Sequence, residues 1–261
     1  MEFVLYLVLG ACAGVLAGLF GVGGGIIIVP VLVFSFTLQG FDASVLTHLA
    51  VGTSLATIVF TSVNAIRAHH RMKAVQWPVV RWMTLGIVLG AAIGAFTASL
   101  IQGPNLQKII GVFAVLVSLQ MVMEFKPKVT RQVPGKLGLG LAGTVIGWAS
   151  AIFGIGGGSL TVPFLTWRSL PMQQAVATSS AVGLPIAIFS ATSFMVLGWH
   201  EPGLPAHSLG FVYLPALLGI AITSMFFAKY GARLAHRLSP RVLKRLFAAL
   251  LFSVGMSFLL S

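Results

Sequence analysis

The chain has 261 residues, of which 57% are hydrophobic and only 8% are charged, and its mean hydropathy is +1.02. Soluble domains carry about 25% charged residues, so this composition excludes an ordinary soluble fold and indicates an integral membrane protein. The formal net charge of +12 would point to nucleic acid only if the basic residues formed one soluble face. Their distribution, given below, favours a topological role, and we expect no nucleic-acid partner.

Ten apolar segments follow one another along the chain, and most approach the roughly 20 residues that a bilayer crossing needs. They cover residues 3–19, 26–36, 46–66, 82–101, 108–123, 137–153, 159–167, 175–198, 211–228 and 242–260. Segments 26–36 and 159–167 are too short to span alone, and each follows a run of glycines. We therefore expect each to form a broken or hairpin unit with the segment before it. Since the first segment carries Glu2 and no basic residue, we expect it to be retained rather than cleaved as a signal peptide.

All but one of the 16 basic residues lie in four regions between these segments. They are Arg67, Arg71, Lys73 and Arg81, then Lys126, Lys128, Arg131 and Lys136, then Arg168, and finally Lys229, Arg233, Arg237, Arg241, Lys244 and Arg245. If each glycine unit returns to its starting side, all four regions face the same side, which is the cytoplasm by the positive-inside rule. We therefore expect a multi-pass inner-membrane protein with cytoplasmic loops at 67–81, 124–136 and 229–245.

The two glycine runs belong to an internal repeat. The first glycine motif, FGVGGGIIIVP (Phe20–Pro30), matches the second glycine motif, FGIGGGSLTVP (Phe153–Pro163), at seven of eleven positions. AVGTS at 50–54 and AVATS at 175–179 follow in the same order. Because the first half begins outside and the second begins inside, we predict an all-α membrane protein of two inverted repeats, each a Gly-broken helical hairpin followed by three transmembrane helices. The repeats cover 1–125 and 137–261, joined by a cytoplasmic linker at 126–136, and secondary transporters share this architecture.

Glycines so close together make a helix hard to sustain. Irregular backbone survives at membrane depth only beside protein or a watery cavity, and a helix that restarts there presents N–H groups and a positive dipole end. Hydroxyls near such a break can bind an anion without a buried charge. The predicted substrate site therefore comprises Gly23, Gly24, Gly25, Thr53, Ser54, Asn64, Gly156, Gly157, Gly158, Ser159, Thr178 and Ser179. The alternatives are close helix packing for the glycines and hydrogen bonds within helices for the hydroxyls and Asn64.

Other chemistries lack support in the sequence. Neither glycine run has the dinucleotide or P-loop spacing, and His69 and His70 lack the partners of a zinc site. We expect no metal, no cofactor, no catalytic residue and no enzyme activity. Gly86, Gly90 and Gly94 form a stripe of small residues for close helix contact, within the protein or in a homodimer.

The chain resembles the TauE/SafE sulfite exporter family. The resemblance rests on GLFGVGGGIIIVPVL (18–32) with AVGTSLATIVFTS (50–62), and on SAIFGIGGGSLTVPFL (150–165) with AVATSSAV (175–182). Ala177 departs from the Gly-Thr-Ser expected there. The resemblance implies a permease for sulfite or organosulfur anions such as sulfonates.

The residues themselves indicate an inverted-repeat transporter with a neutral site for small anions. The combined expectation is a secondary transporter that exports small sulfur-containing anions across the inner membrane by alternating access. A passive small-anion channel is the alternative, and a membrane-embedded enzyme or assembly factor is the third hypothesis. The expected partners are the anion and the lipid bilayer.

Overall fold

The computed structural model describes residues 2–20, 25–123, 133–235 and 240–260. Within these ranges the chain forms helices and one small hairpin. The helices are α1 (Glu2–Phe20), α2 (Gly25–Leu38), α3 (Ala43–Arg71), α4 (Trp77–Ser99), α5 (Gly103–Val122), α6 (Lys136–Phe153), α7 (Gly158–Trp167), α8 (Met172–Leu197), α9 (Leu214–Ala235) and α10 (Pro240–Leu260). The strands β1 (Ser208–Leu209) and β2 (Val212–Tyr213) pair antiparallel. The predicted all-α membrane fold is confirmed.

Helix boundaries differ from the apolar segments where proline or turn residues set them. The segment expected at 211–228 begins as strand β2, and helix α9 starts only at Leu214, with Pro215 in its first turn. Helix α4 starts at Trp77, ahead of the apolar run, because Pro78 suits the first helical positions and Arg81 is accommodated near the helix end.

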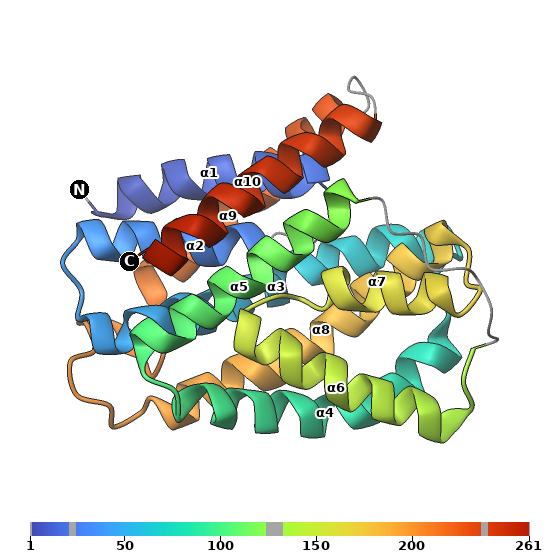
Figure 1. Cartoon of the computed structure of the whole chain (residues 1–261), viewed down its shortest axis with the longest axis horizontal. Coiled ribbons are helices and arrows are strands. Elements are labelled where there is room, and N and C mark those ends of the chain that lie inside the picture. Colours follow the sequence, from blue (N-terminus) through green and yellow to red (C-terminus); the bar gives the residue numbers. More distant parts are fainter. Residues whose placement is uncertain (1, 21–24, 124–132, 236–239, 261) are drawn as a thin grey trace.

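The helices run roughly along the long axis of the molecule, and Figure 1 shows both termini at one end. The connections after α2, α4 and α8 lie at that same end, whereas the α3–α4 and α7–α8 connections lie at the other. Helices α3, α4, α5, α6 and α8 are each long and apolar enough to cross a membrane, and the described parts of α1, α2, α9 and α10 form shorter apolar helices. The chain is thus a multi-pass membrane protein.

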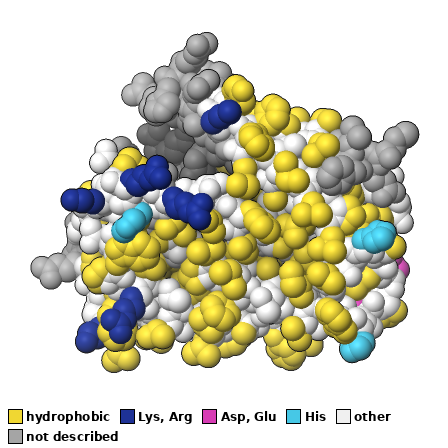
Figure 2. All heavy atoms as spheres, turned by 180° about the vertical axis from the view of Figure 1, so that it is seen from behind, with side chains coloured by type: hydrophobic (Ala, Val, Ile, Leu, Met, Phe, Trp, Pro, Cys, Tyr) yellow, Lys and Arg dark blue, Asp and Glu magenta, His cyan; other side chains and the backbone are white. Residues whose placement is uncertain are grey.

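The distribution of side chains over the surface agrees with helices that cross a membrane. Large apolar side chains such as Leu85 and Leu89 are more than half exposed, and Figure 2 shows hydrophobic side chains covering the face between the two ends. In the same view Lys and Arg side chains gather toward one end, whereas the acidic side chains lie at the other. This separation is what a bilayer between two aqueous compartments requires.

Two helix pairs are held together by glycines. Helix α1 packs on α9, and α6 packs on α4. A Cβ on Gly14 would lie 2.6 Å from the Cα of Ser224, and one on Gly147 would lie 2.9 Å from the carbonyl oxygen of Ile87. Gly147 stands 133 residues after Gly14, so each half of the chain contributes one such helix, which packs closely on a helix of the other half.

The predicted small-residue stripe has a role inside the protein. A side chain on Gly86, Gly90 or Gly94 would collide with the backbone of α6. The atoms met are the carbonyl oxygens of Gly140, Thr144 and Trp148. Of the two expected uses of this stripe, the described structure therefore shows contact within one chain.

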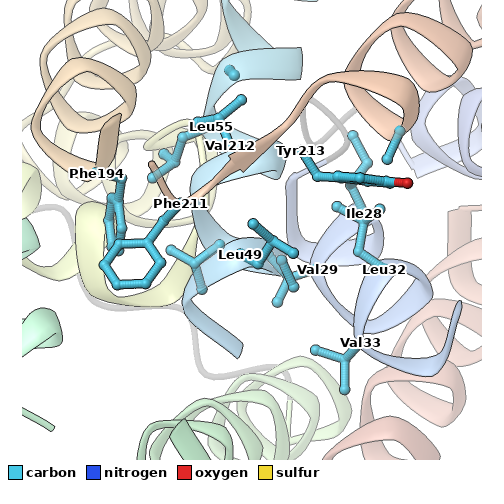
Figure 3. Packing of buried hydrophobic residues seen from close by; sticks show 14 of the residues in the cluster. Ile28, Val29, Leu32, Val33, Leu49, Leu55, Phe194, Phe211, Val212 and Tyr213 are labelled. Atoms are coloured by element: carbon cyan, nitrogen blue, oxygen red, sulfur yellow. The ribbon is translucent and has the colours of Figure 1, made fainter. Parts of the chain in front are cut away.

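Helices α3 and α8 pack against each other in the middle of the bundle. The β1–β2 hairpin, which lies between α8 and α9 in the sequence, closes the bundle end at which the termini lie. Figure 3 shows its side chains alternating, with Phe211 beside Phe194 and Tyr213 toward Ile28. Phe211 and Tyr213 are almost fully buried, so apolar packing seals this end of the bundle.

Candidate functional site

The second glycine motif forms a sharp turn between α6 and α7, which we call the second turn (Gly154–Gly157). Gly154 ends α6 with φ +66°, and Gly157 caps α7 with φ +76°. Both angles lie in the left-handed region, which only glycine adopts without strain. The N–H of Ile155 donates to the Ser150 carbonyl at 3.0 Å, and that of Thr161 to the Gly157 carbonyl at 2.7 Å. The predicted break in the helix is present here, and glycine is needed to form it.

Residues 21–24 of the first glycine motif, which include the predicted site residues Gly23 and Gly24, lie outside the described residues. Gly25 begins α2 and is buried. A Cβ there would lie 2.9 Å from the carbonyl oxygen of Gly154 and 3.0 Å from the Cα of Ile155. The start of α2 therefore touches the second turn directly, although 129 positions separate Gly25 from Gly154 in the sequence.

Ser54 connects these two segments. Its hydroxyl donates to the carbonyl oxygen of Gly154 at 2.9 Å and lies 3.5 Å from that of Gly25. The Ser54 side chain is fully buried. Because a hydroxyl has one hydrogen to donate, Ser54 in this structure holds the backbone of the turn.

Thr53 and Thr178 occupy matching positions and make matching bonds. The Thr53 hydroxyl accepts a hydrogen bond from the N–H of Tyr213, just before α9, at 2.9 Å. The Thr178 hydroxyl accepts one from the N–H of Gln76, just before α4, at 3.0 Å. Each threonine thus caps the start of a helix that lies in the other half of the chain.

The remaining predicted residues are placed differently from one another. Gly156, Gly157, Gly158 and Ser159 belong to the second turn and the start of α7, and Ser179 is buried in α8. Asn64 is exposed on α3, ten residues from Ser54 and so about 15 Å farther along the helix. The structure brings Gly25, Ser54 and the second turn together, and it leaves Asn64 apart from them.

Two isoleucines and one further glycine shape the surroundings of the second turn. A Cβ on Gly156 would lie 2.8 Å from Ile58 of α3, and one on Gly157 would collide with the end of Ile186 of α8. Gly183 of α8 faces the turn without a side chain, and a Cβ there would lie 2.5 Å from the Gly156 carbonyl oxygen. The backbone of α8 therefore lies directly against the turn.

Sequence reasoning missed two hydroxyls beside this turn. Ser150 and Thr161 are fully buried, and neither hydroxyl has a hydrogen-bond partner within the described residues. Ser150 is on α6 one helical turn before Gly154, and Thr161 is in the first turn of α7. Comparison of SLT at 159–161 with III at 26–28 would have identified Thr161, because the glycines around them are identical.

In the described part of the chain, the groups that contact the second turn are neutral: glycine backbone, hydroxyls, and the side chains of isoleucine and valine. Such a site offers hydrogen-bond donors without formal charge, which suits a small anion near the N-terminus of α7. Among the described residues, no cluster of three or more His, Cys, Asp or Glu side chains is placed to hold a metal ion.

Comparison with known proteins gives a consistent result. The family model of the sulfite exporter TauE/SafE matches residues 6–258. A "Probable membrane transporter protein" of Haemophilus influenzae is 39% identical over 258 residues, which cover 98% of each chain. Similarly named proteins of Methanocaldococcus jannaschii and Bacillus subtilis are each 29% identical, over 99% and 98% of this chain and 97% and 96% of their own.

No solved structure matches the chain. The names of the relatives point to membrane transport rather than catalysis. Because the family model covers nearly the whole sequence, the chain belongs to the TauE/SafE sulfite exporter family.

Proposed function

We propose that the protein is a secondary transporter that exports small sulfur-containing anions, such as sulfite or organosulfonates, across the inner membrane. The contact between the start of α2 and the second turn, bridged by Ser54, carries the proposal. It places a helix start and several neutral donors in the interior of a membrane protein. Buried helix starts of broken membrane helices bind anionic groups in secondary transporters.

Alternating access is supported by matching contacts between the two halves. Gly10 and Gly14 of α1 pack on α9, and Gly143 and Gly147, each 133 residues later, pack on α4. The caps made by Thr53 and Thr178 match in the same way. These correspondences favour two inverted repeats, 1–125 and 137–261, that rock around a site between them.

The cytoplasmic face of this transporter is proposed to be the end where α3 and α7 finish. Arg67, Arg71, Lys73 and Arg168 belong to that end, whereas Asp42 lies at the opposite one. An excess of Lys and Arg marks the cytoplasmic side of membrane proteins. Loops 67–81, 124–136 and 229–245 would then be cytoplasmic.

Flux into proteoliposomes tests the proposal. Vesicles that contain the purified chain should exchange sulfite or methanesulfonate faster than protein-free vesicles. Absence of flux across a panel of small anions would contradict it. Accumulation against a gradient, driven by a proton or ion gradient, would separate a secondary transporter from a passive channel, which is the alternative. Chemical turnover of the anion in detergent, where there is no second compartment, would favour an enzyme.

A further inference from the structure

The two glycine motifs share their glycines and differ in polarity. After the glycines, the second motif carries Ser159 and Thr161. At the equivalent positions, 133 residues earlier, the first motif carries Ile26 and Ile28, both buried. Ser150 adds a third hydroxyl just before the second turn. The structure therefore places hydroxyls at one glycine motif and apolar side chains at the other.

The hydroxyls of Ser150, Ser159 and Thr161 have no hydrogen-bond partner in the part of the chain that the structure describes. Ser150 and Thr161 are fully buried, with exposed fractions of 0%. Buried polar groups are nearly always hydrogen-bonded, because an unpaired hydroxyl loses its water without replacement. Three such groups around one turn are donors that a bound acceptor can use.

Two of the hydroxyls lie beside Gly157. A Cβ built on Gly157 would lie 3.4 Å from Thr161 Oγ1 and 3.8 Å from Ser150 Oγ, and it would collide with the end of the Ile186 side chain. Gly157 is also the N-cap of α7. The N–H groups in the first turn of this helix, such as that of Ser159, point toward the cap, and the positive end of the helix dipole lies there. Hydroxyl and backbone donors thus face the same small volume, which an anion would enter by displacing the end of the Ile186 side chain.

We propose that the anion binds at the second turn alone, held by the hydroxyls of Ser150, Ser159 and Thr161 together with the N-terminal N–H groups of α7. The first motif, with Ile26 and Ile28, is the apolar counterpart and binds no anion. This inference rests on the proposed transport function and narrows its site to one repeat. Several hydrogen-bond donors beside the N-terminus of a helix suit a small oxyanion that accepts several hydrogen bonds on one centre.

Anion binding to the purified full chain in detergent tests this site, with sulfite and methanesulfonate as probes in a calorimetric titration. The double variant Ser159→Ile with Thr161→Ile gives the second motif the residues of the first. Charge-assisted hydrogen bonds are strong enough that each lost hydroxyl should weaken binding about tenfold or more. The matched control is Ser190→Ala, another fully buried hydroxyl without a partner, seven residues beyond Gly183 on α8, which should bind as the wild type does.

A folded double variant that binds either anion with wild-type affinity would overturn the inference. If the double variant does not fold, the pair Thr161→Val and Thr161→Ser decides, since serine restores the hydroxyl and valine keeps the shape. Weaker binding in the valine variant alone supports the site, and equal affinity contradicts it. Failure of the transport proposal looks different, because the wild type would then neither bind nor move any of these anions.

Thiol protection gives a second readout. Cys12 is the single cysteine and is exposed, so Cys12→Ser provides a cysteine-free background. On that background we expect methanesulfonate, which unlike sulfite does not react with thiol reagents, to slow the modification of Ser159→Cys by such a reagent and to leave that of Ile26→Cys unchanged. Equal protection at both positions would contradict binding at one motif only.

Discussion

Gly183 is the position at which α8 meets the second turn. A Cβ added there would lie 2.5 Å from the carbonyl oxygen of Gly156, whereas favourable contacts begin at about 3.5 Å. Since the Gly156 oxygen belongs to the backbone and cannot rotate away, the Gly183→Ala variant must move the turn and α8 apart by about 1 Å. Overpacking of this kind costs about 1–3 kcal/mol, while alanine gains about 1 kcal/mol in helix propensity. We expect a net loss of up to about 2 kcal/mol and impaired transport.

Gly140→Ala in α6 is the matched control. Its added Cβ would meet only the Trp82 carbonyl oxygen, at 4.0 Å, so it gains the same propensity without the clash. The difference in free energy of unfolding between the two variants gives the cost of the clash, about 1–3 kcal/mol. Each kcal/mol lowers the melting temperature by about 2–4 °C for a chain of this size. Thermal unfolding in detergent and sulfite flux in proteoliposomes measure both effects. Equal melting temperatures and equal fluxes for the two variants would refute the reasoning.

Three further outcomes are expected. Thr53→Val removes the acceptor that the buried N–H of Tyr213 uses, and it should lower the free energy of unfolding by about 1–3 kcal/mol. Thr84→Val is the control, because the Thr84 hydroxyl bonds to the Val80 carbonyl of its own helix, and it should change thermal unfolding much less. Gly157→Ala places a side chain on a residue in the left-handed region, at φ +76°, which costs about 1–2 kcal/mol. The variant should reduce flux even where the protein still inserts into the membrane. Unchanged flux would contradict the role of the second turn in transport. The backbone N–H and hydroxyl of Ser44 lower the pKa of Asp42, so the carboxylate stabilises the start of α3 above the unfolded-state pKa, and this stabilisation is lost as the pH falls through the folded-state pKa. Melting temperatures across an acid series should therefore fall less in Asp42→Ala than in the wild type.

Elements with strong local patterns could be predicted from the sequence. The apolar segments correspond to helices, and the glycines at 154–157 do interrupt the helix, because the left-handed angles at Gly154 and Gly157 are a local property of glycine. Helix boundaries differ from the apolar segments at two prolines. Helix α4, with Pro78 in its first turn, begins before its apolar segment, and α9, with Pro215 in its first turn, begins after the start of its own.

Long-range partners could not be predicted. The bond between Thr53 and Tyr213 spans 160 residues, and that between Thr178 and Gln76 spans 102. No periodicity in one segment encodes such pairs, since they depend on how the helices pack. The hydroxyl of Ser150 was missed for the same reason. In the sequence it is one small residue of α6 among others, and only the folded structure places it beside the second turn. The inverted repeat and the predicted site residues stay predictions, with Gly23 and Gly24 outside the described residues.

Two consecutive residues of α3 bind the β1–β2 hairpin and the second turn. Thr53 accepts from the backbone of Tyr213 in the hairpin, and Ser54, the next residue of α3, donates to the backbone of Gly154 in the turn. A shift of α3 that draws Thr53 away from the hairpin must also pull on the turn. Opening of the bundle end at the β1–β2 hairpin and rearrangement of the second turn would then occur together, because no intermediate residue separates the two bonds.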